Sequence, residues 1–257
     1  MYGGRGYRPT GGTGLGFGPP FTPPIIKQLL ITLACVFLAE NFVELRGALS
    51  VQPVSVWEHG YLWQPFTYMW LHEGLGHIAM NCFVLWMFGS PLAMAWGPKR
   101  FLRFYLVCGI GAGVLIATVP YLLYALGGSN YSLVMSTLGA SGAIYGVILA
   151  YSLTWPDRTI MLIFPPVAFR AIWLIPALFF MQVVLDPNNT SKVSHVGHLG
   201  GVAVGWLYLH STGDARAQIS LASVKHRWRR WRMRRKLRAV QYEEWESKRR
   251  ERDRRYH

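Results

Sequence analysis

The sequence predicts an all-α polytopic membrane protein, in which a bundle of six transmembrane helices precedes a basic C-terminal tail. Two observations indicate this class. Of the 257 residues, 52% are hydrophobic and 15% are charged, whereas soluble domains average about 25% charged residues. The charges also gather at one end, because residues 214–257 hold sixteen of the 26 Lys and Arg. The rest of the chain is as poor in charge as membrane-spanning segments are.

Composition divides the chain into three regions. Residues 1–24 are rich in Gly and Pro and have no apolar core, which predicts a flexible leader rather than a cleavable signal peptide. Residues 25–212 form the expected membrane domain, and residues 213–257 form a basic, helical cytoplasmic tail. The cysteines, Cys35, Cys82 and Cys108, lie in apolar runs and indicate neither a disulfide framework nor a CxxC metal site.

Six apolar segments are candidates for the spans, since about 20 apolar residues in a helix cross a bilayer. The fourth span is expected to start at Ser141 and to end at Pro156, which stops a helix. The fourth and sixth candidates are short and rich in Gly, which indicates helices that end inside the protein. The other five candidates are residues 25–43, 77–96, 104–126, 167–185 and 196–210.

The distribution of basic residues predicts the orientation. With six spans both termini share one side, and 24 of the 26 basic residues fall on that side. The opposite connections hold only Arg46 and Lys192. Because positive charge marks the cytoplasmic side, we expect an integral multi-pass protein with both termini in the cytoplasm, in a bacterial inner membrane. The longest connection, residues 46–76, is aromatic and is expected to pack partly into the membrane interface.

Polar residues in three spans need a reason, because ionisable groups within a membrane are costly. His77 and Asn81 are four apart and share one helix face. One reading is an interhelical hydrogen-bonding pair. The other is a pair of donors aimed at a developing negative charge.

The stretch GASG places Ser141 at the start of the fourth span, where backbone N–H groups lack partners and stabilise an anion. Gly139 and Gly142 would let a substrate backbone approach closely. The other reading is a small-residue packing face, since Gly142 and Gly146 form a GxxxG pattern. Tyr145 lies one turn below Ser141 on the same helix.

The sixth span carries His198, with Gly201 and Gly205 on the same helix face. A smooth glycine face allows tight contact with another small-residue helix, and docking on the fourth span would bring His198 towards Ser141. His195 has the spacing of some metal pairs, but no third ligand of suitable type accompanies it, so no metal site is expected.

A serine needs a base to become a nucleophile. A Ser–His dyad of Ser141 and His198 is the expected design, because no carboxylate lies near mid-span to complete a triad. Asp157 and Asp186 lie at span ends, and Glu40 lies in the first span.

Over residues 25–210 the chain resembles the rhomboid intramembrane serine proteases, so the expected bundle is rhomboid-like. HIAMN is similar to the family's H-x-x-x-N, which implies that His77 and Asn81 stabilise the oxyanion together with Ser141. GASGAIYG is similar to its G-x-S-G, which implies Ser141 as nucleophile and Tyr145 as ring support. HLGGVAVG is similar to its last-span pattern, which implies His198 as general base.

His72 matches a further histidine of the family at the foot of the long loop. Two positions depart from the family: Gln64 follows Trp63 where the family commonly has Arg, and Ala93 stands where an acidic residue is common. Both concern loop anchoring and helix ends rather than chemistry.

The resemblance implies an intramembrane endopeptidase that cleaves transmembrane segments of membrane proteins, without a cofactor. The alternative is a catalytically silent rhomboid-like adaptor that binds client helices. The basic tail, with tryptophans among its arginines, is expected to bind anionic lipid headgroups. Nucleic-acid binding by the tail is the less favoured reading, because no recognised nucleic-acid-binding domain accompanies it.

Overall fold

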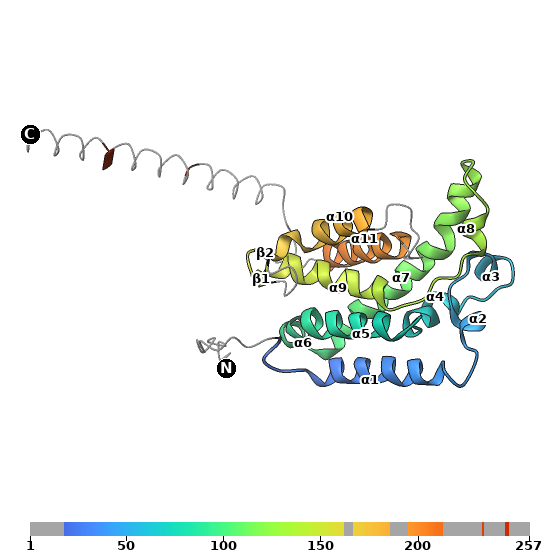
Figure 1. Ribbon diagram of the computed structural model, residues 1–257, viewed down its shortest axis with the longest axis horizontal. Coiled ribbons are helices and arrows are strands. Elements are labelled where there is room, and N and C mark those ends of the chain that lie inside the picture. Colours follow the sequence, from blue (N-terminus) through green and yellow to red (C-terminus); the bar gives the residue numbers. More distant parts are fainter. Residues whose placement is uncertain (1–17, 162–166, 186–194, 213–232, 234–244, 247–257) are drawn as a thin grey trace, which may run out of the picture. The chain divides into compact units, whose positions relative to one another are not determined.

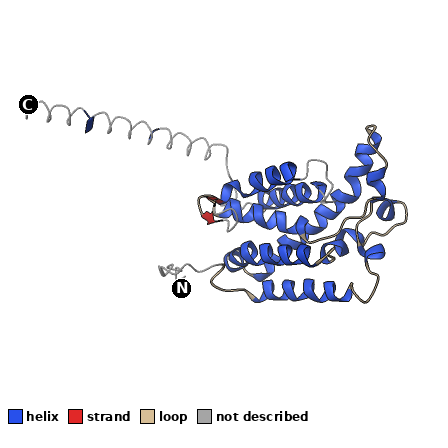
Figure 2. Ribbon diagram, in the orientation of Figure 1, coloured by secondary structure: helices blue, strands red, loops and turns tan. Residues whose placement is uncertain are grey.

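The computed structural model describes residues 18–161, 167–185, 195–212, 233 and 245–246. The chain divides into two compact units, Met1–Thr212 and Gly213–His257. Most of the expected leader, and all of the expected basic tail except residues 233, 245 and 246, lies outside the described residues. The described part of the first unit is mostly helical (Figure 2).

Within the described residues of the first unit there are seven longer helical stretches, and shorter helices connect them (Figure 1). A π-helical turn, η2 (Leu85–Gly89), joins α5 to α6. The longer helices are α1 (Pro24–Ala39), α5 (Leu75–Val84), α6 (Ser90–Trp96), α7 (Pro98–Ala125), α9 (Ser141–Thr154), α10 (Leu174–Leu185) and α11 (His195–Ser211). The shorter ones are α2 (Arg46–Leu49), α3 (Pro53–Trp57), α4 (Gln64–Thr67), η1 (Tyr68–Trp70), α8 (Tyr131–Val134) and η3 (Ala171–Trp173).

Two stretches are long and apolar enough to cross a membrane by length and composition, namely Leu75–Trp96 and Pro98–Ala125. Shorter apolar helices are Pro24–Ala39, Ser141–Thr154 and Ala171–Phe180. By this criterion the described residues contain two of the six expected spans, and the six-span arrangement stays a prediction.

Three predicted spans differ from the structure by more than two residues at one end, and the third span begins at Pro98 rather than at residue 104. The first ends at Ala39 rather than near residue 43, and the Asn41 side chain donates to the Phe37 carbonyl at 2.8 Å. This bond occupies one of the carbonyls that a helix end leaves without a partner. The fifth was expected from residue 167, but its α-helix begins at Leu174.

A short hairpin takes the place of the expected start of the fifth span. Strand β1 (Thr159–Met161) pairs antiparallel with β2 (Ala168–Arg170). The amide of Ala171 then donates to the Arg158 carbonyl at 2.8 Å. Because these backbone groups are already paired across the hairpin, they are not available for helical hydrogen bonds. The expectation of an all-α fold is therefore wrong at this connection.

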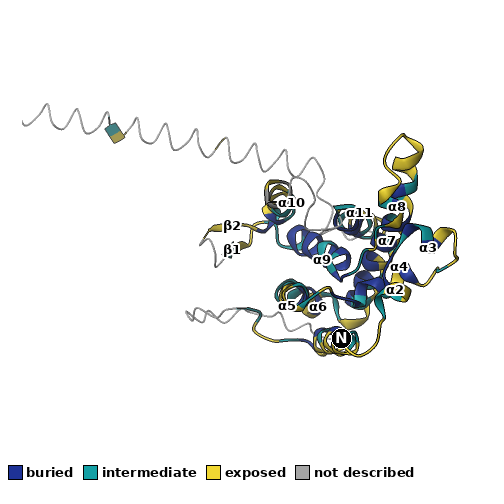
Figure 3. Cartoon of the chain, turned by 45° about the vertical axis from the view of Figure 1, so that its right-hand side comes forward, coloured by how far each residue is buried: buried dark blue, intermediate teal, exposed yellow. Residues whose placement is uncertain are grey.

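Helix α9 is the centre of the first unit. It packs against α7, α10 and α11 and also contacts α5 and α6. Figure 1 shows it between α10 and α11 on one side and α5 and α6 on the other. Nearly all of its residues from Gly142 to Leu153 are buried (Figure 3). A helix that is apolar all round is expected in such a position. The core position explains why the fourth apolar segment is short and rich in small residues.

The long connection between α1 and α5 is an ordered, hydrogen-bonded structure. Trp57 Nε1 donates to the Ala117 carbonyl of α7 at 3.1 Å. Val51 and Thr137 exchange two backbone hydrogen bonds of 2.9 and 2.8 Å, and the Gly139 amide donates to the Tyr68 carbonyl at 2.9 Å. These bonds fix the extended segment that leads directly into Ser141.

Candidate active site

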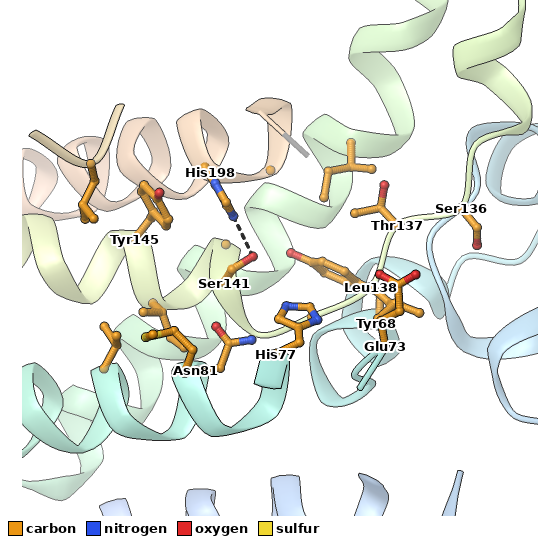
Figure 4. Close-up of a pocket in the computed structure, with 18 of the residues that line it drawn as sticks. Tyr68, Glu73, His77, Asn81, Ser136, Thr137, Leu138, Ser141, Tyr145 and His198 are labelled. Atoms are coloured by element: carbon orange, nitrogen blue, oxygen red, sulfur yellow. Dashed lines mark hydrogen bonds between the residues drawn. The ribbon is translucent and has the colours of Figure 1, made fainter. Parts of the chain in front are cut away.

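Ser141 and His198 meet inside the first unit, although 57 residues separate them in the chain. Ser141 is the first residue of α9 and His198 lies in the first turn of α11. Ser141 Oγ and His198 Nε2 are 2.9 Å apart, a hydrogen-bond distance (Figure 4). The His198 side chain is buried. The arrangement places a hydroxyl next to an imidazole nitrogen in a site largely removed from solvent.

Glycines bring the two helices to this distance. A Cβ atom on Gly201 would collide with the carbonyl oxygen of Gly142, so the two backbones are in direct contact. One turn further along, a Cβ atom on Gly205 would lie 3.3 Å from the Cα atom of Gly146. Larger residues at these positions would separate α9 from α11, and with them the hydroxyl from the imidazole.

Tyr145 lies against the imidazole of His198. Its ring stacks on the His198 ring, with centroids 4.0 Å apart and planes tilted by 12°. Tyr145 lies four residues after Ser141, on the same face of α9. The aromatic face therefore limits the rotation of the imidazole while Nε2 stays directed at Ser141 (Figure 4).

Gly139 occupies a position that excludes a side chain. Its φ of +124° lies in a region that favours glycine. A Cβ atom there would also lie 2.8 Å from Cε1 and 2.9 Å from Nε2 of His77. The absence of a side chain at Gly139 thus lets the His77 ring approach the backbone just before Ser141.

His77 and Asn81 lie on α5, across the pocket from His198 (Figure 4). The side-chain amide nitrogen of Asn81 is buried and has no hydrogen-bond partner among the described residues. The fully buried His72 packs edge-on against His77, with ring centroids 5.0 Å apart. The α5 face therefore presents donors on the side of the pocket opposite the imidazole.

A pocket of about 830 Å³ connects these groups. Its polar part contains Ser141, His198, His77 and Asn81, together with the wall residue Tyr68, which sequence reasoning missed. The Tyr68 hydroxyl donates to the Gly109 carbonyl at 2.8 Å. Nothing in the sequence separates this tyrosine from its aromatic neighbours in the long connection. Apolar side chains that also line the pocket include Met80 and Val84 of α5, Ile144 and Ile148 of α9, and Leu178 of α10.

Two further residues lie outside the sequence-based set, although each carried a signal. Glu40 and Arg46 form an ion pair of 3.3 Å beside the loop that leads to α5. Glu40 is a carboxylate within an apolar run, and Arg46 is one of the few basic residues on the expected outer side; both are unusual in a membrane protein.

No group of three His, Cys, Asp or Glu within residues 18–161, 167–185 and 195–212 is arranged to hold a metal ion.

The two departures from the family pattern are both buried. Gln64 is fully buried, and its Oε1 accepts from the Gln52 amide at 3.1 Å. Trp63 Nε1 donates to the Ala48 carbonyl at 2.9 Å. Ala93 is buried within α6. At position 64 a neutral side chain thus anchors the long connection.

Comparison with known proteins gives a consistent family. The model of the Rhomboid domain matches residues 59–213, which include Ser141, His198, His77 and Asn81. Rhomboid protein 1, mitochondrial, of Saccharomyces cerevisiae is 30% identical over 141 residues, which is 53% of this chain and 38% of that protein.

Two further relatives come from an animal and a plant. Presenilin-associated rhomboid-like protein, mitochondrial, of Mus musculus is 33% identical over 139 residues, covering 54% of this chain and 35% of the relative. RHOMBOID-like protein 1 of Arabidopsis thaliana is 29% identical over 166 residues, covering 64% and 38%. The match therefore spans little more than a third of the length of these relatives.

Proposed function

Because the chain belongs to the rhomboid family, we propose that it is an intramembrane serine endopeptidase that cleaves transmembrane segments of other membrane proteins. The observation that carries this proposal is the 2.9 Å distance between Ser141 Oγ and His198 Nε2. A catalytically silent adaptor that binds client helices would not need a hydroxyl and an imidazole held at hydrogen-bond distance in a pocket.

The proposed reaction begins with proton transfer from Ser141 Oγ to His198 Nε2 while the oxygen attacks a peptide carbonyl carbon. The C–N bond of the resulting tetrahedral intermediate then breaks, and His198 gives its proton to the leaving amine. Water, deprotonated by the same imidazole, next attacks the acyl-enzyme ester, and the imidazole returns that proton to Ser141 Oγ as the ester C–O bond breaks. Tyr145 supports the imidazole throughout, and the stacking of the two rings at 4.0 Å supports this role.

Negative charge that develops on the carbonyl oxygen needs donors. The backbone N–H of Ser141 at the start of α9 is one, because helix N-termini leave such groups without internal partners. We assign His77 and the Asn81 amide as the others. The unsatisfied amide nitrogen of Asn81 supports this assignment, since an oxyanion would supply the acceptor that the resting pocket lacks.

The substrate is proposed to enter between α5 and α10, because the apolar side of the pocket is formed partly by Val84 and Leu178 from these helices. A helical substrate must unwind locally to expose a peptide carbonyl, and small residues favour unwinding in a membrane. Segments with such residues near the outer end of a span are the proposed substrate class.

We further propose the six-span arrangement, in which residues 25–212 form the membrane domain and both termini lie on the same side of the membrane. The distribution of basic residues supports this orientation. The expectation of a bacterial inner membrane gains no support, because the relatives described above are eukaryotic proteins and two are named as mitochondrial.

A membrane-impermeant maleimide tests the proposed topology. It should label the cysteine of Leu62→Cys and that of Lys99→Cys from opposite sides of the membrane; labelling of both from one side would contradict the topology.

The basic tail, residues 213–257, is proposed to bind anionic lipid headgroups, with attraction of about 1 kcal/mol per basic residue near the surface. Its composition supports the proposal. The isolated tail peptide should float with vesicles that contain phosphatidylserine at low salt, and high salt should release it. Equal flotation with neutral vesicles would contradict an electrostatic attachment.

Labelling by a fluorophosphonate tests the proposed chemistry. The purified chain should become labelled and should cleave a fluorogenic transmembrane peptide, and both properties should be lost in Ser141→Ala and in His198→Ala. Ser152→Ala is a matched control, because Ser152 lies on the same helix but bonds the Ile148 carbonyl. An unchanged product from Ser141→Ala would refute the assignment, and a folded wild-type chain without label or product would favour the adaptor.

A further inference from the structure

An ion pair between a buried carboxylate and a half-exposed guanidinium joins the end of α1 to the long connection, since the Arg46 side chain is 43% exposed. The Glu40 side chain is only 2% exposed, and its Oε1 accepts from Arg46 Nε at 3.3 Å. Glu40 directly follows α1, at the negative end of the helix dipole. The fold thus keeps a desolvated carboxylate where the helix itself disfavours one.

The pair holds one residue of the loop from both sides. Glu40 Oε2 accepts from the backbone amide of His72 at 3.0 Å. Arg46 Nη2 donates to the carbonyl of His72 at 3.0 Å and to that of Glu73 at 3.3 Å. Both backbone groups of His72 are thereby fixed by the two charged side chains, which we call the Glu40–Arg46 clamp.

The clamp lies next to the proposed oxyanion donors. His72 precedes α5 by three residues, and His77 is the third residue of that helix. The His72 ring also packs edge-on against the His77 ring, with centroids 5.0 Å apart. Backbone and ring therefore both transmit the position of His72 to His77, whose imidazole packs against Gly139.

Stability alone does not explain such a pair. Solvent at the half-exposed Arg46 screens the attraction between the charges, and desolvation of the buried Glu40 carboxylate opposes it, so the pair contributes little net stability. Charged hydrogen bonds do, however, fix geometry more firmly than apolar contacts. Arg46 and Glu73 also line the pocket itself, so the clamp borders the space that a substrate occupies.

We propose that Glu40 and Arg46 are positioning residues, which set the place of His77 and thereby the stabilisation of the oxyanion. The inference rests on the proposed protease function and deepens it. Because a misplacement of about 1 Å costs about 10²-fold in rate, loosening the clamp lowers kcat while substrate binding in the apolar part of the pocket is retained.

Glu40→Gln tests the clamp with the smallest change in shape. Arg46 and His72 donate to different oxygens of Glu40, so in glutamine one of these two donors would face an NH2 group that cannot accept. We therefore expect kcat to fall at least about tenfold with KM changed less than about twofold. Arg46→Lys keeps the charge but not the bridge between two carbonyls, and its kcat should be intermediate. Glu44→Gln is the matched control, because Glu44 is exposed in the same loop and, among the described residues, its side chain accepts a hydrogen bond from the Arg46 backbone amide but none from His72.

Two outcomes would overturn the proposal: a kcat of Glu40→Gln equal to that of Glu44→Gln, or a fall that matches lost thermal stability and disappears on cooling. Hydrogen exchange of residues 71–77 in the Ser141→Ala background gives a readout that needs no activity. Exchange at His72 should accelerate in Glu40→Gln and not in Glu44→Gln, and equal exchange would also overturn it. A wild-type chain without activity would refute the protease function instead, while the exchange still reports on the clamp.

Discussion

Asn81 has a hydrogen-bonding group that the described structure leaves unused. Its side-chain amide nitrogen is buried without a partner, and leaving a buried donor in this state costs about 1–3 kcal/mol. Violations of this kind are expected at functional sites, where stability is given up for chemistry. The pocket beside Asn81 is the place where the missing acceptor would arrive.

Asn81→Ala should therefore weaken catalysis without weakening the fold. We expect kcat to fall about 10²–10³-fold, as when one oxyanion donor is lost, and the melting temperature to be unchanged or higher. Asn41→Ala is the control, because the Asn41 side chain donates to carbonyls at the end of α1 and lies outside the residues that line the pocket. A parallel loss of activity and stability in Asn81→Ala would mean that the residue is structural.

His72 predicts a pH dependence of stability. Burial lowers the pKa of His72 to about 4, the charge of His77 acts in the same direction, and the backbone of Trp70 opposes it. The unfolded chain, with a histidine pKa of about 6.5, then binds a proton that the folded chain does not. The contribution of the buried, neutral His72 to the free energy of unfolding is therefore complete above pH 6.5 and is lost as the pH falls towards 4.

Thermal unfolding between pH 7.5 and 4.5 measures this effect. The melting temperature of the wild type should fall more steeply with decreasing pH than that of His72→Gln, which cannot titrate. His59→Gln, at an exposed position of the same connection, should keep the slope of the wild type. Identical slopes for all three proteins would show that His72 is not a buried neutral histidine.

At the scale of the helices, the α9–α11 contact sets the geometry of the site. Gly201→Ala should reduce both activity and stability, because the new methyl group would meet the Gly142 carbonyl. Overpacking typically costs about 1–3 kcal/mol. Gly205→Ala should be milder, since its methyl group would lie 3.3 Å from the nearest atom, the Cα of Gly146. Melting temperatures and cleavage rates of the two variants decide this order, and equal effects would contradict it.

The sequence allowed the helices to be predicted better than their ends and connections. Apolar length and Pro156 indicate the fourth segment, and its helix ends at Thr154. The start of the fifth was wrong because hydrogen bonds between β1 and β2 are not visible in a hydropathy pattern. Similarly, Ser141 and His198 were selected as polar residues in apolar runs, whereas the Glu40–Arg46 contact with His72 needs coordinates.

For the molecule as a whole, exposed apolar side chains on the outer face of α7 indicate a surface that contacts lipid. Val107, Ile110 and Val114 are 36–42% exposed and follow one another on one face of the helix. Exposed apolar stripes of this kind are unusual in soluble monomers. In a bilayer they would contact lipid.

Ile110→Lys separates the two environments. In water, a charge at this exposed position would be harmless; within a membrane it should destabilise the protein by about 2.5–3.5 kcal/mol. Leu126→Lys is the control, because Leu126 follows the last residue of α7 and is 76% exposed. Yield in the membrane fraction and melting in detergent should drop for Ile110→Lys only. Normal behaviour of both variants would contradict a lipid-facing α7.

The backbone contact between Gly142 and Gly201 has a consequence for control. Neither glycine has a side chain whose rotamer could change the distance between α9 and α11, so in the proposed protease the separation of the two helices that carry the nucleophile and the base is set by backbone contact alone. Cleavage by the proposed protease would then be controlled by which polypeptides reach the pocket and by how readily they unwind there.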